Sequence, residues 1–123
     1  RGLASGDLDH DGDLDFVVTQ INGSPRLFRN DQALGHHWIR IRLRGNTQNR
    51  DGVGAWIKVT VGGRVLWRQV MPTRSYLSQS ELPVTVGIGD ASGVDALEIV
   101  WPGGKVQSVE NVVIDQVTTV TEE

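Results

Sequence analysis

Alternating apolar and polar residues dominate the chain, and this pattern predicts β-strands rather than helices. In residues 38–44, isoleucine or leucine at positions 39, 41 and 43 alternates with arginine at positions 40, 42 and 44, so one side of the expected strand is apolar. Residues 53–61 show the same period. Gly62-Gly63 follows as a pair suited to the positive φ angles of a two-residue hairpin turn, and residues 64–71 form the expected returning strand. No segment has the period of an amphipathic helix.

Six further segments have strand character and are separated by clusters of glycine, proline, asparagine and aspartate. Short strands punctuated in this way are typical of sandwiches and barrels. We therefore expect an all-β chain with an antiparallel β-sandwich or barrel module. The six segments are 16–20, 26–30, 83–88, 96–101, 106–110 and 116–120.

A polar segment at residues 31–36 predicts a boundary between a short first unit, 1–35, and a longer second unit, 36–123. The first unit holds only about three strands, and a sheet of that size is marginal by itself. Its exposed strand edges favour pairing, so we expect it to dock on the rest of the chain, to form a homo-oligomer with another copy, or to belong to a larger repeat array.

The distribution of charge also distinguishes the two predicted units. The net charge of −3 belongs entirely to residues 1–35, which hold three arginines and six aspartates, whereas basic and acidic side chains balance in residues 36–123. The absence of cysteine excludes disulfides and thiolate zinc sites. No apolar window approaches the roughly 20 residues that span a bilayer. The chain begins without Met or an apolar signal segment, so we expect a mature form or a piece of a longer protein.

The acidity is concentrated in a single loop of nine residues. Two like charges about 4 Å apart repel by roughly 4 kcal/mol at an effective dielectric near 20, so such crowding is unfavourable unless a cation is present. Calcium (Ca²⁺) takes six to eight oxygen ligands, whereas magnesium prefers a small octahedron with retained waters. We therefore predict a calcium site formed by Asp7, Asp9, Asp11, Asp13 and Asp15.

The spacing suggests a role for each aspartate. Asp7, Asp9 and Asp11 would supply side-chain oxygens, Asp13 its backbone carbonyl, and Asp15 would close the site, while a glycine between Asp11 and Asp13 permits a sharp turn. An EF-hand is excluded, because its twelfth position, counted from Asp7, is a valine rather than a carboxylate. The alternative is a solvated acidic turn without a cation.

The acidic loop and its flanks resemble the FG-GAP or VCBS repeat found in integrin α-subunit propellers and many bacterial surface proteins. Residues 6–18 and 27–30 carry this resemblance, which covers residues 1 to about 32. It implies one propeller blade with a calcium loop between two strands. The family shows several such repeats where this chain has one, so either a fragment of a larger propeller protein or a naturally short relative is expected.

The remainder resembles the ASPIC/UnbV domain that follows such repeats in cartilage acidic protein and its bacterial relatives. The resemblance covers about residues 36–121, and it implies a β-module next to a propeller without bringing an activity. Five segments carry it: 37–43, 49–55, 75–80, 87–91 and 100–107.

Two groups of side chains in the second unit are candidates for ligand binding. Arg40, Arg42 and Arg44 form a basic stripe, which either pairs with carboxylates across strands or meets an anionic partner. Among four tryptophans, Trp56 is out of phase with its apolar neighbours and is therefore the best candidate for an exposed sugar-stacking surface. A nucleic-acid partner is not expected, because the second unit is not basic overall.

Together these features predict a calcium-binding, non-catalytic interaction or scaffold module with a protein or glycan partner. The resemblances imply an extracellular, cell-surface or periplasmic location. One alternative is a carbohydrate-binding module that uses Trp56. A second is an accessory domain of a hydrolase, although the uniform acidic loop lacks the two distinct carboxylate environments that acid–base catalysis needs. No other catalytic motif is apparent, so we expect no enzyme.

Overall fold

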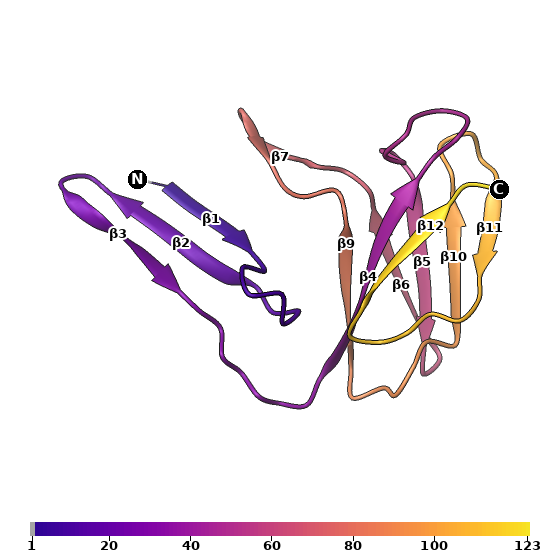
Figure 1. Ribbon diagram of the computed structural model, residues 1–123, viewed down its shortest axis with the longest axis horizontal. Helices are drawn as coiled ribbons and strands as arrows, with labels where there is room; N and C mark the ends of the chain where they lie inside the picture. The colour runs from indigo at the N-terminus through magenta and orange to yellow at the C-terminus, as the bar shows by residue number, and fades with distance from the viewer. Residues whose placement is uncertain (1) are drawn as a thin grey trace. The chain divides into compact units, whose positions relative to one another are not determined.

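The computed structural model describes residues 2–123, which form two compact units that divide between Leu34 and Gly35 (Figure 1). Every regular element in residues 2–123 is a strand, and no helix there could cross a membrane. The first unit is one antiparallel sheet with strand order β1-β2-β3. Its strands are β1 (Gly2–Gly6), β2 (Asp15–Gln20) and β3 (Gly23–Phe28).

The second unit contains two main sheets and a small hairpin, and neither sheet closes into a barrel within residues 2–123. The first sheet has the strand order β11-β10-β5-β6 and the second β12-β4-β9, while β7 and β8 pair with each other. The strands are β4 (His37–Arg44), β5 (Trp56–Val61), β6 (Arg64–Gln69), β7 (Thr73–Ser75), β8 (Ser78–Gln79), β9 (Val84–Gly89), β10 (Ala96–Val100), β11 (Val106–Val109) and β12 (Val117–Thr121).

The alternating residues pack between the two main sheets, as the sequence pattern predicts. Branched aliphatic side chains from both sheets fill a single core together with the indole of Trp101. Burial of this apolar surface is the main stabilising contribution to the sandwich. The fully buried members of the core are Ile39, Ile41, Ala55, Ile57, Val59, Val86 and Ile99.

The hairpin between β5 and β6 forms at the predicted glycine pair. Gly62 and Gly63 have φ angles of 54° and 75°, and the turn aligns Val61 with Arg64 across the two strands. Because a two-residue turn fixes the register, it also sets which side chains meet further along the sheet.

Three features differ from the expected strand pattern. β1 is a strand although its sequence is rich in glycine, and the short β7–β8 hairpin lies where no strand was expected. β12 pairs with β4 in parallel, whereas the other strand pairs of residues 2–123 are antiparallel. The parallel pairing of β12 with β4 joins segments that are far apart in the sequence, which local periodicity does not encode.

Candidate metal centre

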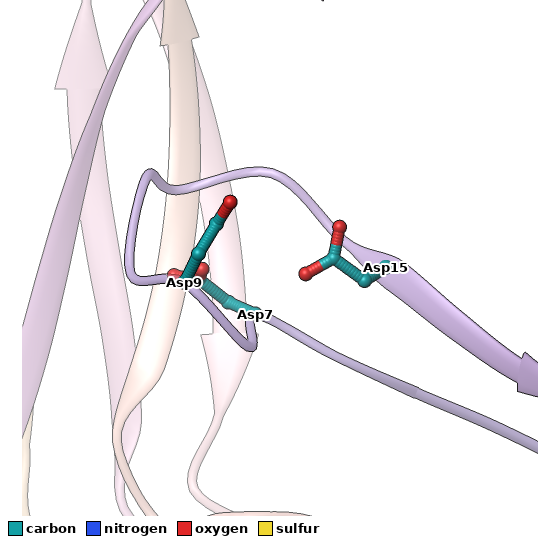
Figure 2. A group of neighbouring side chains, drawn as sticks. All are labelled: Asp7, Asp9 and Asp15. Carbon is teal, nitrogen blue, oxygen red and sulfur yellow. The ribbon is translucent and has the colours of Figure 1, made fainter. Parts of the chain in front are cut away.

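The acidic loop joins β1 to β2, so its two ends lie on neighbouring strands. Asp15 is the first residue of β2 and pairs with Gly6, the residue directly before Asp7. Asp9 projects from the loop between them (Figure 2). One carboxylate oxygen from each of Asp7, Asp9 and Asp15 lies within 4.8 Å of the other two. Strand pairing thus brings together side chains that are eight residues apart.

The loop closes on itself through hydrogen bonds from backbone N–H groups to aspartate carboxylates and through two residues in the left-handed backbone conformation. His10 and Gly12 have φ angles of 64° and 96°, which reverse the chain direction between the two strands. The N–H of Gly12 donates to Asp7 Oδ2 over 3.2 Å, and the N–H of Asp13 donates to Asp11 Oδ1 over 2.9 Å. These bonds hold the loop in a compact turn of the kind that aspartate side chains stabilise.

Asp15 is the most deeply buried of the acidic residues, with 1% of its surface exposed. Its Oδ1 accepts a hydrogen bond from the N–H of Asn30, and its Oδ2 accepts one from the N–H of Leu8, each over 2.9 Å. These two bonds hold the pKa of the Asp15 carboxyl below its usual range, despite the opposing effect of desolvation. Asp15 is therefore a negative charge inside the site at neutral pH.

Arg29 lies beside the cluster. Arg29 Nε is 3.9 Å from Asp9 Oδ2 and 2.5 Å from Asp31 Oδ1. The hydrogen bond and charge of Asp31, with smaller effects from Asp9 and Asp15, raise the pKa of the guanidinium further above its already high value. Arg29 thus offsets part of the negative charge next to the candidate metal ligands.

The structure gathers three of the five predicted ligands and places the other two differently. Asp11 and Asp13 are not part of the close group found among residues 2–123. Asp11 bonds to the backbone of Asp13, and Asp13 Oδ1 accepts a hydrogen bond from Gln32 Nε2 over 3.3 Å. The side chain of Asp13 is therefore engaged elsewhere, which is compatible with the backbone role expected for this residue.

The donor chemistry of the close group fits a hard cation. It consists of carboxylate oxygens alone, without the nitrogen or sulfur ligands that zinc and copper prefer. The close group contributes one oxygen from each of three carboxylates, whereas calcium takes six to eight, so second carboxylate oxygens, carbonyl oxygens of the loop or waters would complete the coordination.

The basic stripe predicted on β4 is interrupted in the structure. Arg40 is 5% exposed, and its guanidinium forms an ion pair with the carboxylate of Glu81. Arg42 and Arg44 are exposed. A continuous basic surface of three arginines is therefore not present, because Arg40 is buried and paired with Glu81 while Arg42 and Arg44 are exposed.

Trp56 lies on the exposed side of its sheet, as its phase predicts, with 43% of its surface accessible. It meets Trp67 of β6, which is 47% exposed, with ring centroids 6.4 Å apart and ring planes at 80°. The two indoles and Val100 line an open surface depression of about 440 Å³. Trp67 was not singled out in the sequence, although the register of the Gly62-Gly63 hairpin places it next to Lys58 and diagonal to Trp56.

Comparison with known proteins identifies the second unit. The family described as ASPIC and UnbV matches residues 45–123, which is more than half of the chain, whereas no curated protein matches. Domains of this family are typically non-catalytic accessory domains of larger proteins. The chain therefore belongs to the ASPIC and UnbV family.

Proposed function

We propose that the loop between β1 and β2 binds Ca²⁺ and that the chain acts as a non-catalytic extracellular interaction or scaffold module. The observation that carries the proposal is the convergence of carboxylate oxygens from Asp7, Asp9 and Asp15 to within 4.8 Å of one another. Three negative groups at that separation repel one another, and a divalent cation converts the repulsion into attraction.

The residues around the cluster prepare it for a cation. Hydrogen bonds from Leu8 and Asn30 keep Asp15 ionised and fix its orientation, while the N–H of Gly12 donates to Asp7 and orients its carboxylate. Asp9 is exposed and can turn toward an ion. Asp11, through its side chain, and Asp13, through its carbonyl, remain the candidates for further ligands.

The packing of the first unit supports its proposed role as one FG-GAP-type propeller blade. Asp15 is the only buried residue among residues 2–34, so the sheet has no core of its own. The strand register places Phe16 and Phe28 on one face and Val17 and Leu27 on the other. A sheet with apolar residues on both faces is suited to a position between two further layers.

An extracellular location agrees with the kind of site proposed. Calcium sites in extracellular modules have dissociation constants of about 10⁻⁴–10⁻³ M, weaker than those of cytosolic sensors. An open loop with an exposed Asp9 and a competing Arg29 is suited to this weak range. At millimolar calcium, which is at or above these dissociation constants, the bound ion would hold the loop rigid. The blade would then present a fixed surface.

The proposal is tested by calorimetric unfolding of the full chain in about 10 mM calcium and in excess chelator. A ligand present at about 100 times its dissociation constant stabilises the native state by roughly 2.7 kcal/mol, so calcium should raise the melting temperature. Asp9→Ala should reduce the shift strongly, and Asp11→Ala should reduce it less. Asp90→Asn, which neutralises an exposed aspartate of the second unit, is the matched control and should keep it. A parent chain without a calcium-dependent shift would refute the proposal.

A further inference from the structure

The outer face of the sheet β11-β10-β5-β6 carries a group of exposed apolar side chains. Antiparallel pairing aligns Val106, Val100 and Trp56 in one row across the sheet, while Trp67 lies in the next row beside Lys58. The opposite face of the same strands forms the core. This aromatic corner is therefore held by strands whose position the core fixes, as a rigid binding surface requires.

The two indoles form a corner rather than a flat patch. With the ring planes at 80°, the face of one indole stands nearly perpendicular to the other, and Val100 completes the open depression of about 440 Å³. This volume falls in the lower part of the range of about 300–1,000 Å³ that is typical of small-molecule sites. A ligand in the corner could stack on one ring while its edge meets the other.

Polar groups at the margin of the corner are paired but keep hydrogen-bonding capacity. Lys58 Nζ bonds to Glu98 Oε2 over 2.5 Å and lies 5.9 Å from the centroid of the Trp67 ring. An ammonium group has three donors and a carboxylate has two acceptor oxygens, so each keeps groups for a further partner. Lys58 and Glu98 are the only charged residues that the four described strands place on this face, so it has no net charge.

We propose that this corner binds an uncharged, pyranose-containing oligosaccharide. A pyranose ring presents C–H groups on its faces and hydroxyls around its edge. The C–H face would stack on an indole, whose π-face is electron-rich, and the hydroxyls would reach Lys58, Glu98 and Gln69. The proposed sugar binding involves only residues of the second unit and does not depend on the proposed calcium site.

Charge and shape favour this ligand over other occupants. An acidic glycan or a phosphate would need an unpaired cation, whereas Lys58 is neutralised by Glu98. A second protein copy would favour a flat surface, whereas the edge-to-face indoles produce a step. A purely structural role, in which Trp56 and Trp67 only stabilise the pairing of β5 with β6, would explain why the two rings are in contact. It would not require both rings to remain nearly half exposed.

The experiment is isothermal titration of the full chain with cellohexaose, xylohexaose, mannohexaose and maltohexaose, with polygalacturonate as an acidic comparison. We expect at least one neutral hexasaccharide to bind, with the same affinity in calcium and in chelator. Trp56→Ala and Trp67→Ala should each raise the dissociation constant by about tenfold or more. Trp67→Phe, which keeps an aromatic face, should retain binding within about threefold. Tyr76→Ala removes an exposed aromatic residue of the β7–β8 hairpin and should have no effect.

Several outcomes would overturn this proposal. One is the absence of binding to all four neutral hexasaccharides at about 10 mM, and another is binding that persists in the Trp56→Ala/Trp67→Ala double variant. Preference for polygalacturonate would contradict the neutral character of the corner. A dimer in light scattering that both tryptophan substitutions dissociate would assign this face to self-association instead. If calcium did not change the melting temperature while sugar binding was intact, the result would contradict only the proposed calcium site.

Discussion

The carboxylate of Asp15 accepts a hydrogen bond over 2.9 Å from the backbone N–H of Asn30, which lies just beyond β3. Its second oxygen accepts a hydrogen bond from Leu8 in the acidic loop. One buried side chain therefore links the loop, the start of β2 and the segment after β3. This link makes the conformation of the first unit sensitive to the protonation of a single group.

Acid should loosen the loop through Asp15. Because the folded-state pKa of Asp15 is lowered, its contribution to stability is fully present above the unfolded value, near 3.9, and is lost as the pH falls through the lower folded-state pKa. In chelator, the amide NMR signals of Leu8 and Asn30 should stay constant from neutral pH to about pH 4 and change below it. The Asp15→Asn variant should lack this transition, and a transition above pH 5 in the parent would contradict the assignment.

The five aspartates should contribute unequally to calcium affinity. Asp7→Asn and Asp9→Asn each remove a charge from the close group, so each should weaken binding by about tenfold or more. Asp13→Asn should change the affinity by no more than about threefold, because its side chain bonds to Gln32 outside the group. Calorimetric titration measures all three, and equal losses would show that the carboxylates act only through total charge.

Arg29 should weaken calcium binding, because its positive charge lies 3.9 Å from Asp9. The Arg29→Gln substitution should therefore increase calcium affinity by about threefold or more at low ionic strength, and the gain should shrink in about 1 M salt as screening increases. Arg26→Gln, at an exposed position on β3 three residues before Arg29, is the matched control and should have a smaller effect. A loss of affinity in Arg29→Gln would show instead that Arg29 holds Asp9 in place.

The core of the second unit contains a hydrogen bond that should be sensitive to substitution. Trp101 Nε1 donates to Gln107 Oε1 over 2.8 Å in a buried setting, and Gln107 Nε2 donates to the carbonyl of Thr121. Gln107→Leu would leave the indole N–H unsatisfied and should lower the free energy of unfolding by about 1–3 kcal/mol. Urea unfolding followed by tryptophan fluorescence measures this loss.

The control for that measurement is Ser108→Ala on the exposed face of β11, which should change stability by less than about 0.5 kcal/mol. Calcium should not alter either result, because both residues belong to the second unit. Equal stability of Gln107→Leu and the parent would mean that the Trp101 hydrogen bond contributes nothing to the sandwich.

Much of the second unit could be predicted from alternation and turns. The buried apolar positions of β4 and the exposure of Trp56 follow from the period of two, and the glycine pair fixes the β5–β6 hairpin. The same hairpin register was sufficient to identify Trp67 as a neighbour of Lys58, so this part of the aromatic corner was accessible from the sequence.

Other features depend on contacts that no local pattern records. Buried Arg40 forms an ion pair with Glu81, which comes from a distant segment, and the parallel pairing of β12 with β4 depends on the path of the whole chain. In the acidic loop the sequence identifies the aspartates but not the three that converge. That selection arises from the pairing of β1 with β2 and from the backbone hydrogen bonds that hold Asp15.

The most direct test of the calcium assignment is a crystal structure of the full chain grown in calcium. We predict an ion between Asp7, Asp9 and Asp15, with six to eight oxygen ligands at about 2.3–2.6 Å and an anomalous signal that excludes water and sodium. Ordinary water at that position, with the three carboxylates turned toward solvent at saturating calcium, would contradict the assignment.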